Sequence, residues 1–124
     1  MISTERVERA RPFLEAALEY TQGTHTYADV VQDLDTGKSQ LWDTDQAAVV
    51  TEIHVSPRAK TCHLFLAGGD LNELERILRI IERWAKSEGC TRMSLAGRRG
   101  WERTFLRGEG YAPAWTVMTK ELDS

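Results

Sequence analysis

The sequence lacks long apolar runs, and this absence limits what the protein can be. No stretch approaches the ~18–20 apolar residues of a membrane span, so we expect no transmembrane helix. The first nine residues are too polar for a secretory signal. Cys62 and Cys90 stand alone, without a C-x-x-C pair, so we expect no metal site and a reducing, cytoplasmic compartment.

An excess of positive charge is missing as well. The chain has 16 Lys and Arg against 19 Asp and Glu, a net charge of -3, which disfavours a nucleic-acid coat protein. The charge is unevenly distributed, however. Residues 92–107 hold five arginines and one glutamate, a charge of +4, which leaves -7 for the rest of the chain.

What remains is typical of a globular domain. The 124 residues are 41% hydrophobic and 28% charged, without repeats, low-complexity tracts or linkers. This length predicts one domain over residues 1–124.

The first half of the sequence predicts two helices and three strands. A helix is expected over residues 4–20, and a second from the capping box Thr26–Asp29 to Gly37. Short strands follow at 39–42, 47–54 and 60–67. Their short connections predict an antiparallel meander. In the third strand, alternation places Cys62, Leu64 and Leu66 on one face, and His63 and Phe65 on the other.

The second half begins with the strongest pattern. After Gly68-Gly69, apolar residues keep helical spacing from 70 to 88. The strand at 91–95 must lie parallel to the strand at 60–67, because a helix connects them. A short helix at 100–107 and a strand at 111–121 follow. The order predicts a mixed α/β sheet: two helices, an antiparallel meander, then helix, strand, helix, strand.

Three stretches carry a resemblance to a known family: the strand–Gly-Gly–helix at 60–88, the helix end Trp84–Gly89, and the run Trp101–Tyr111. Together with the element order, they resemble the Gcn5-related N-acetyltransferases (GNAT). The pattern Gly97-Arg98-x-Gly100-Trp101-x-Arg103 with Gly110-Tyr111 is similar to small GNAT-like proteins of tailed bacteriophages and prophages.

The resemblance implies a place for acetyl-CoA. Its acyl-CoA-binding residues would be Gly68, Gly69, Leu64, Phe65 and Leu66, with backbone amides near the last three polarising the thioester carbonyl. A simple strand-to-helix turn also explains the two glycines. In the family, the pantetheine arm enters a gap between the strands expected at 60–67 and 91–95.

Glu52 and His54 are the candidate catalytic residues. They lie two positions apart on one strand, so both side chains face the same way and either one could accept a proton from an amine. The alternative is an exposed sheet-face glutamate. His63 is interpreted as a packing residue and His25 as part of a surface loop.

Two departures from the family suggest a degenerate acetyl-CoA site. Asp70 and Glu73 stand at the start of the long helix, where they would repel a diphosphate. The family's general-acid tyrosine aligns with Phe105, which cannot donate a proton, whereas Tyr111 lies elsewhere.

The arginine-rich segment is the candidate anion or partner surface. Arg98 and Arg99 precede a helix, and Arg99 and Arg103 would share one of its faces. Trp101 beside them suits a partner surface. Arginines paired with acidic residues of the same chain are the alternative.

These observations leave several hypotheses for function. The first is a phage or prophage GNAT-like protein with a degenerate acetyl-CoA site, a structural protein that binds phage assembly or virion components in the host cytoplasm or the virion. The second is an active N-acetyltransferase, which transfers acetyl from acetyl-CoA directly to a small-molecule amine. The third and weaker one is an adaptor that binds acidic protein or nucleic acid through its arginines.

Overall fold

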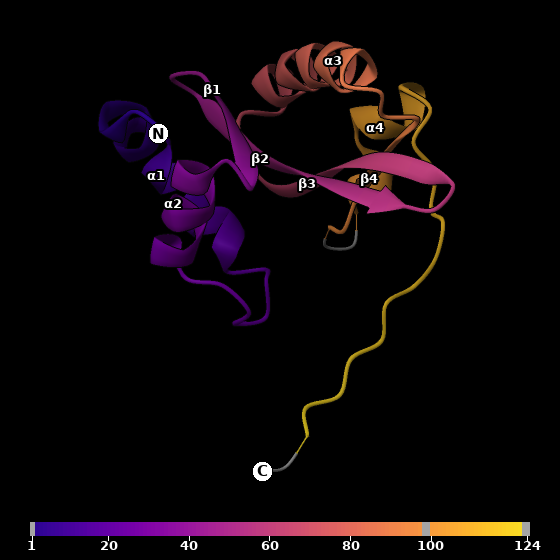
Figure 1. Cartoon of the computed structure of the whole chain (residues 1–124), viewed down its shortest axis with the longest axis horizontal. Coiled ribbons are helices and arrows are strands. Elements are labelled where there is room, and N and C mark those ends of the chain that lie inside the picture. The colour runs from indigo at the N-terminus through magenta and orange to yellow at the C-terminus, as the bar shows by residue number, and fades with distance from the viewer. Residues whose placement is uncertain (1, 98–99, 123–124) are drawn as a thin grey trace.

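A computed structural model describes residues 2–97 and 100–122 of the chain (Figure 1). The helices are α1 (Thr4–Leu18), α2 (Tyr27–Thr36), α3 (Leu71–Ser87) and α4 (Phe105–Gly108), with a 3-10 turn, η1, at Trp101–Arg103. The strands are β1 (Ser39–Asp43), β2 (Ala47–Ser56), β3 (Ala59–Gly69) and β4 (Arg92–Leu95). In this described part of the chain, no helix is long and apolar enough to cross a membrane.

The four strands form one mixed sheet with helices on both faces. The order is β1-β2-β3-β4, antiparallel in the first two pairs and parallel between β3 and β4. α1 and α2 bury their apolar side chains on one face, with Leu14 and Leu34 at the centre of that core. α3 and α4 bury Ile81 and Leu106 on the other face. This is the mixed α/β sheet that the sequence predicts.

The helix starts follow the sequence signals closely. The Thr26 hydroxyl accepts the Asp29 amide hydrogen, and the Asp29 carboxylate accepts the Thr26 amide hydrogen, so the predicted capping box is present. Gly37 ends α2 at φ 83°, a backbone conformation that favours glycine. At α3, Asp70 caps the helix by accepting the Glu73 amide hydrogen at 3.0 Å.

Three predicted details are wrong. Residues 111–122 form no strand, because nothing in the described chain pairs with this segment. The helix expected at 100–107 is divided into η1 and α4 by Thr104, whose backbone is extended. Leu66 lies on the face opposite Leu64, because β3 contains a bulge that interrupts simple alternation.

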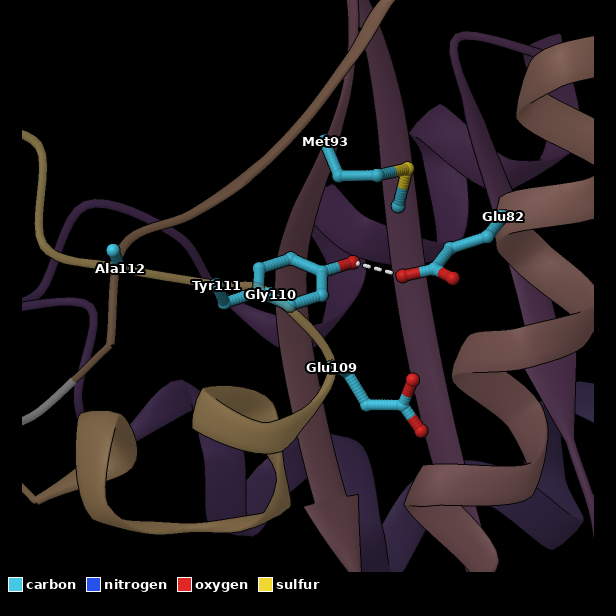
Figure 2. Close-up of a pocket in the computed structure, with 6 residues that line it drawn as sticks. All are labelled: Glu82, Met93, Glu109, Gly110, Tyr111 and Ala112. Carbon is cyan, nitrogen blue, oxygen red and sulfur yellow. Dashed lines mark hydrogen bonds between the residues drawn. The ribbon is translucent and has the colours of Figure 1, made fainter.

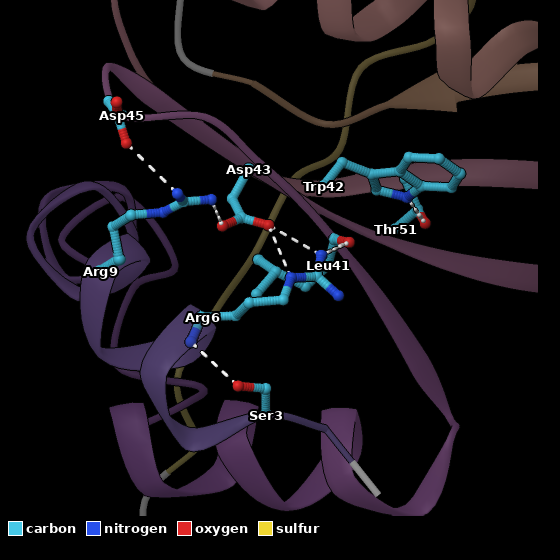
Figure 3. Close-up of polar contacts among 8 residues, drawn as sticks. All are labelled: Ser3, Arg6, Arg9, Leu41, Trp42, Asp43, Asp45 and Thr51. Atoms are coloured by element: carbon cyan, nitrogen blue, oxygen red, sulfur yellow. Dashed lines mark hydrogen bonds and ion pairs between the residues drawn. The ribbon is translucent and has the colours of Figure 1, made fainter.

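A buried carboxylate ties α1 to the edge of the sheet (Figure 3). Asp43 of β1 accepts hydrogen bonds from Arg6 at 2.7 and 3.0 Å and from Arg9 at 2.5 Å. Arg6 also donates to the Leu41 carbonyl at 2.8 Å, and Arg9 reaches the exposed Asp45 at 3.2 Å. Charge-assisted bonds of this kind fix the start of α1 over β1.

Replacing Asp43 should therefore loosen α1 from the sheet. We expect Asp43→Ala to lower the free energy of unfolding by about 1–2 kcal/mol, since both arginines stay half in water and recover part of their hydration. The matched change Asp45→Ala, at an exposed carboxylate, should cost less than about 0.5 kcal/mol. Urea unfolding of the two variants measures the difference, and equal losses would contradict the assignment.

Candidate functional site

The sheet opens between β3 and β4 at a bulge. In the β2–β3 pair, Val50 lies opposite Leu66 and Thr51 opposite Leu64, so Phe65 is an extra residue in β3. The parallel pairing of β3 with β4 ends at the level of Leu64 and Leu95. Residues 65–69 of β3 therefore have no pairing with β4, and their backbone groups on that side are available to a ligand.

A trough of about 370 Å³ lies beside the end of β3. One wall is the end of β3 with the start of α3, and the other is the segment that holds η1 and α4. The lining residues are Ala67, Gly68, Gly69, Leu71, Leu74, Gly100, Trp101 and Thr104. This volume is within the usual range for a small-molecule site.

The two glycines line this trough, but packing within the chain explains why they are glycines. A Cβ on Gly68 would lie 2.5 Å from the Phe13 carbonyl oxygen of α1. A Cβ on Gly69 would lie 2.3 Å from the Gln46 carbonyl oxygen, and its φ of 115° also favours glycine. The close backbone approach is therefore to α1 and the β1–β2 turn, and it brings the start of α3 next to the sheet.

The acidic residues at the start of α3 are partly neutralised. The Asp70 carboxylate caps the helix, and Glu73 pairs with Arg76 at 3.0 Å. Neither side chain is among the residues that line the trough. Because Asp70 occupies only the Glu73 amide, the amides of Leu71 and Asn72 have no partner within the helix.

The opposite face of the sheet carries a chain of polar side chains near the same opening. Glu52 Oε1 and His54 Nε2 of β2 lie 3.1 Å apart. The His54 ring stacks on His63 of β3, with centroids 5.0 Å apart and an angle of 20° between the planes. His63 Nδ1 is in turn 2.9 Å from Ser94 Oγ of β4. These four side chains span β2, β3 and β4, and the last of them, Ser94, stands one residue before Leu95, where the β3–β4 pairing ends.

The environment of His63 favours its neutral form. Burial lowers the pKa of this imidazole, and the neighbouring His54 lowers it further, whereas Glu52 opposes the shift. Because the charged form is disfavoured, His63 is a weaker proton acceptor than a histidine in water.

Sequence reasoning predicted Glu52 and His54 as candidate catalytic residues and interpreted His63 as a packing residue, and these assignments stay predictions. The i, i+2 spacing correctly placed the first two side chains together. His63 and Ser94 meet only through the β3–β4 register, in which they lie side by side, and no local pattern shows this pairing. His25 lies in the α1–α2 loop, as expected, and its ring contacts Phe65 at a centroid distance of 4.6 Å.

The comparisons with solved structures agree on the architecture. A protein from Thermus thermophilus superimposes with a TM-score of 0.67 at 16% identity, covering 98% of this chain and 93% of that one. The ribosomal-protein-alanine N-acetyltransferase of Brucella melitensis biovar Abortus 2308 gives 0.68 at 11%, covering 98% and 96%. An aminoglycoside acetyltransferase from an uncultured soil metagenomic sample gives 0.68 at 8%, covering 99% and 93%.

The chain has the GNAT acetyltransferase fold. No protein-family model matches the sequence, and no curated protein matches it. At these identities the likeness establishes the fold, and the chemistry has to be argued from the residues themselves.

Within this GNAT fold, the residues expected to bind acyl-CoA surround the opening. Phe65 is the extra residue of the bulge, with Leu64 and Leu66 on either side of it, and Gly68 and Gly69 line the trough. Whether they bind acyl-CoA stays a prediction.

The expected arginine surface is only partly described. Arg98 and Arg99 lie outside the described residues. Arg103 is exposed in η1, while Trp101 packs against the core under α3 and also forms part of the trough wall. Trp101 thus contributes to the trough, and its role in binding a partner stays a prediction.

A second pocket lies away from the trough, under Tyr111 (Figure 2). Its phenol donates to Glu82 Oε2 at 2.6 Å. Burial and this carboxylate raise the pKa of Tyr111 far above its ordinary value. Phe105 packs against the core. No tyrosine is therefore among the trough-lining residues in the described part of the chain.

In residues 2–97 and 100–122, no group of three His, Cys, Asp or Glu side chains is placed to hold a metal ion. Cys62 is buried, and burial raises the pKa of its thiol to about 11, so the thiol stays protonated near neutral pH.

The pKa of His63 gives a direct test of the arrangement of Glu52, His54 and His63. We expect a pKa below 6.5 in NMR titrations of the ring, and His54→Gln should move it upward because a charged neighbour is removed. Glu52→Gln should move it downward. The folded chain binds this proton less tightly than the unfolded chain, so His63 lowers the free energy of unfolding as the pH falls below 6.5. Unchanged titration in both variants would contradict the arrangement.

Proposed function

We propose that this protein is an N-acetyltransferase that transfers an acetyl group from acetyl-CoA to an amine. The observation that carries the proposal is the ending of the β3–β4 pairing at Leu64 and Leu95, beside a trough at the start of α3. A closed sheet at this position would leave no place for the pantetheine arm.

The residues around the opening suit acetyl-CoA. The unpaired backbone of residues 65–69 would hold the amides of the pantetheine arm in the manner of an added strand. The amides of Leu71 and Asn72 at the start of α3 would hold phosphate oxygens. Acetyl-CoA supplies the acetyl group as an activated thioester. The bulge leaves backbone groups around Phe65 outside the regular ladder, where an amide would polarise a carbonyl oxygen.

The polar side chains Glu52 and His54, on the opposite face of the sheet, would accept the proton of the amine. The nitrogen must lose a proton as it forms a bond to the acetyl carbon. Glu52 and His54 form a hydrogen-bonded pair that takes up this proton, directly or through water, and passes it to solvent from the exposed His54 ring.

The interpretation as a structural protein with a degenerate site has less support. It rested on repulsion by Asp70 and Glu73 and on Phe105 in place of a tyrosine. Asp70 caps its helix and Glu73 pairs with Arg76, which weakens the first ground, while the second remains. Phage origin, virion partners and cellular location stay untested predictions. The absence of a tyrosine from the trough-lining residues in the described part of the chain implies that the thiolate leaving group is protonated by solvent.

Binding is tested by blocking the trough without disturbing the core. Leu71 lines the trough and is 50% exposed, while Ile80 on the same helix is 48% exposed and lies outside it. We expect Leu71→Glu to weaken acetyl-CoA binding at least about tenfold, because it places a carboxylate beside the phosphates. Ile80→Glu should bind like the parent chain. Isothermal titration measures both, and no binding by the parent at millimolar acetyl-CoA would refute the proposal.

Turnover is tested with a panel of primary amines and polyamines. In Glu52→Gln we expect kcat to fall by roughly 10²–10⁴-fold while the acetyl-CoA Kd stays constant, because the general base is lost and the trough is untouched. The matched change Glu15→Gln, at an exposed position of α1, should leave kcat unchanged. Equal rates in both variants would remove Glu52 from the mechanism.

A further inference from the structure

A row of polar side chains crosses the sheet where the pairing of β3 with β4 ends. Glu52 of β2 lies opposite His63 of β3, and His63 lies beside Ser94 of β4. Residues paired in this way have their side chains on the same face of a sheet. The row stops one residue before Leu95, the last residue of β4, so Ser94 is its member at the opening.

Glu52 is separated from the opening by the width of β3. Its strand lies two strand spacings, about 10 Å, from β4, whereas a proton passes between heavy atoms about 3 Å apart. The side chains at the place where the pairing ends are apolar: Leu64, Phe65, Leu66 and Leu95. A proton released at the opening therefore has to cross β3 before it reaches Glu52.

His63 and Ser94 are placed to bridge this distance. His63 Nδ1 lies 2.9 Å from Ser94 Oγ, and the His54 ring stacks on His63 and fixes the plane of its imidazole. In the described part of the chain, His63 Nε2 has no hydrogen-bond partner, yet no buried side-chain nitrogen there lacks one, so Nε2 is in contact with water. One ring nitrogen thus bonds Ser94 and the other meets solvent, as a proton shuttle requires.

The charges around His63 suit the transfer of a proton rather than its storage. Burial and the neighbouring His54 disfavour the charged imidazolium and lower the pKa of His63, whereas Glu52 opposes this shift. His63 therefore holds a proton only in transit. The carboxylate of Glu52 favours movement of the positive charge away from the opening.

We propose that Ser94 and His63 carry the proton of the attacking amine from the opening to the Glu52–His54 pair. This inference rests on the proposed acetyl transfer and adds two residues to it. Ser94 contacts the amine at the opening, and His63 acts through Ser94 rather than on the substrate.

The transfer moves one proton and oxidises nothing. As the amine nitrogen forms its bond to the acetyl carbon, one N–H hydrogen goes to Ser94 Oγ while the Ser94 hydroxyl hydrogen goes to His63 Nδ1. His63 releases its Nε2 hydrogen to water or to Glu52 and is neutral again. The carbon–sulfur bond breaks, and the CoA thiolate leaves with the electron pair and takes a proton from solvent. Exchange with water restores the starting tautomer of His63.

The tautomer of His63 gives a test that needs no turnover. The relay requires that Nδ1 accept a hydrogen bond from Ser94 and that Nε2 carry the ring hydrogen in the resting protein. ¹⁵N NMR of the histidine-labelled full chain, at a pH above the pKa of His63, distinguishes the two neutral forms. We expect the Nε2–H form. A resting Nδ1–H form would overturn the relay and leave the proposed acetyl transfer untouched.

Kinetics of variants at Ser94 give the second test. We expect Ser94→Ala to lower kcat at least about tenfold, because the relay loses its first member, while the acetyl-CoA Kd and the melting temperature stay close to those of the parent. Ser94→Thr keeps the hydroxyl on a residue that suits a strand, so it should retain most of the parent rate. The matched change Ser56→Ala, at the exposed end of β2, should leave kcat unchanged.

A double variant distinguishes a relay from a merely structural hydrogen bond. His63→Asn keeps an acceptor for the Ser94 hydroxyl but cannot take up its proton, so kcat should fall as in Ser94→Ala. The double variant should be no slower than either single one, because both residues serve one route. Losses that multiply, or a parent rate in Ser94→Ala, would overturn the relay alone. A parent that acetylates no amine would instead refute the proposed function, and the relay with it.

Discussion

One extra residue in β3 determines the shape of the candidate site. Phe65 sits in a bulge opposite the Val50–Thr51 step of β2, and pairing with β4 ends at Leu64, directly before it. A bulge bends and twists its strand, and beyond it residues 65–69 of β3 have no pairing with β4, whose last residue is Leu95. The trough lies beside this unpaired end of β3.

The two helical layers hold the opening in place from either side. Phe13 of α1 touches the backbone at Gly68, and the turn at Gln46 touches Gly69, so the end of β3 is fixed where it leaves the sheet. α1 itself is tied to β1 through Asp43. The opening is thus built into the packed structure before any ligand arrives, which is the condition for binding without a large ordering cost.

The sequence predicted those features that depend on local chemistry. The capping box of α2, the Asp70 cap of α3, the period of α3 and the parallel placement of β4 follow from neighbouring residues, and so does the pairing of Glu52 with His54. The reciprocal bond that would make Asp70 and Glu73 a second capping box is not formed, because the Asp70 amide donates to the Gln46 carbonyl. The bulge at Phe65 has no such signature, because residues 64–67 are all apolar and do not mark which side chain faces which way, so Leu66 was assigned to the wrong face. The contact of His63 with Ser94 depends on a register between strands 31 residues apart. Residues 111–121 alternate like a strand, but alternation alone does not supply the partner that a strand needs.

The opening between β3 and β4 should bind acetyl-CoA, and everything proposed for the chemistry depends on this. Amide chemical-shift mapping by NMR during titration with acetyl-CoA tests it at the level of single residues. We expect shifts concentrated in residues 65–69 at the end of β3 and 71–74 at the start of α3, with β1 unaffected. Saturable binding with shifts confined to another surface, or no shifts at millimolar ligand, would contradict it.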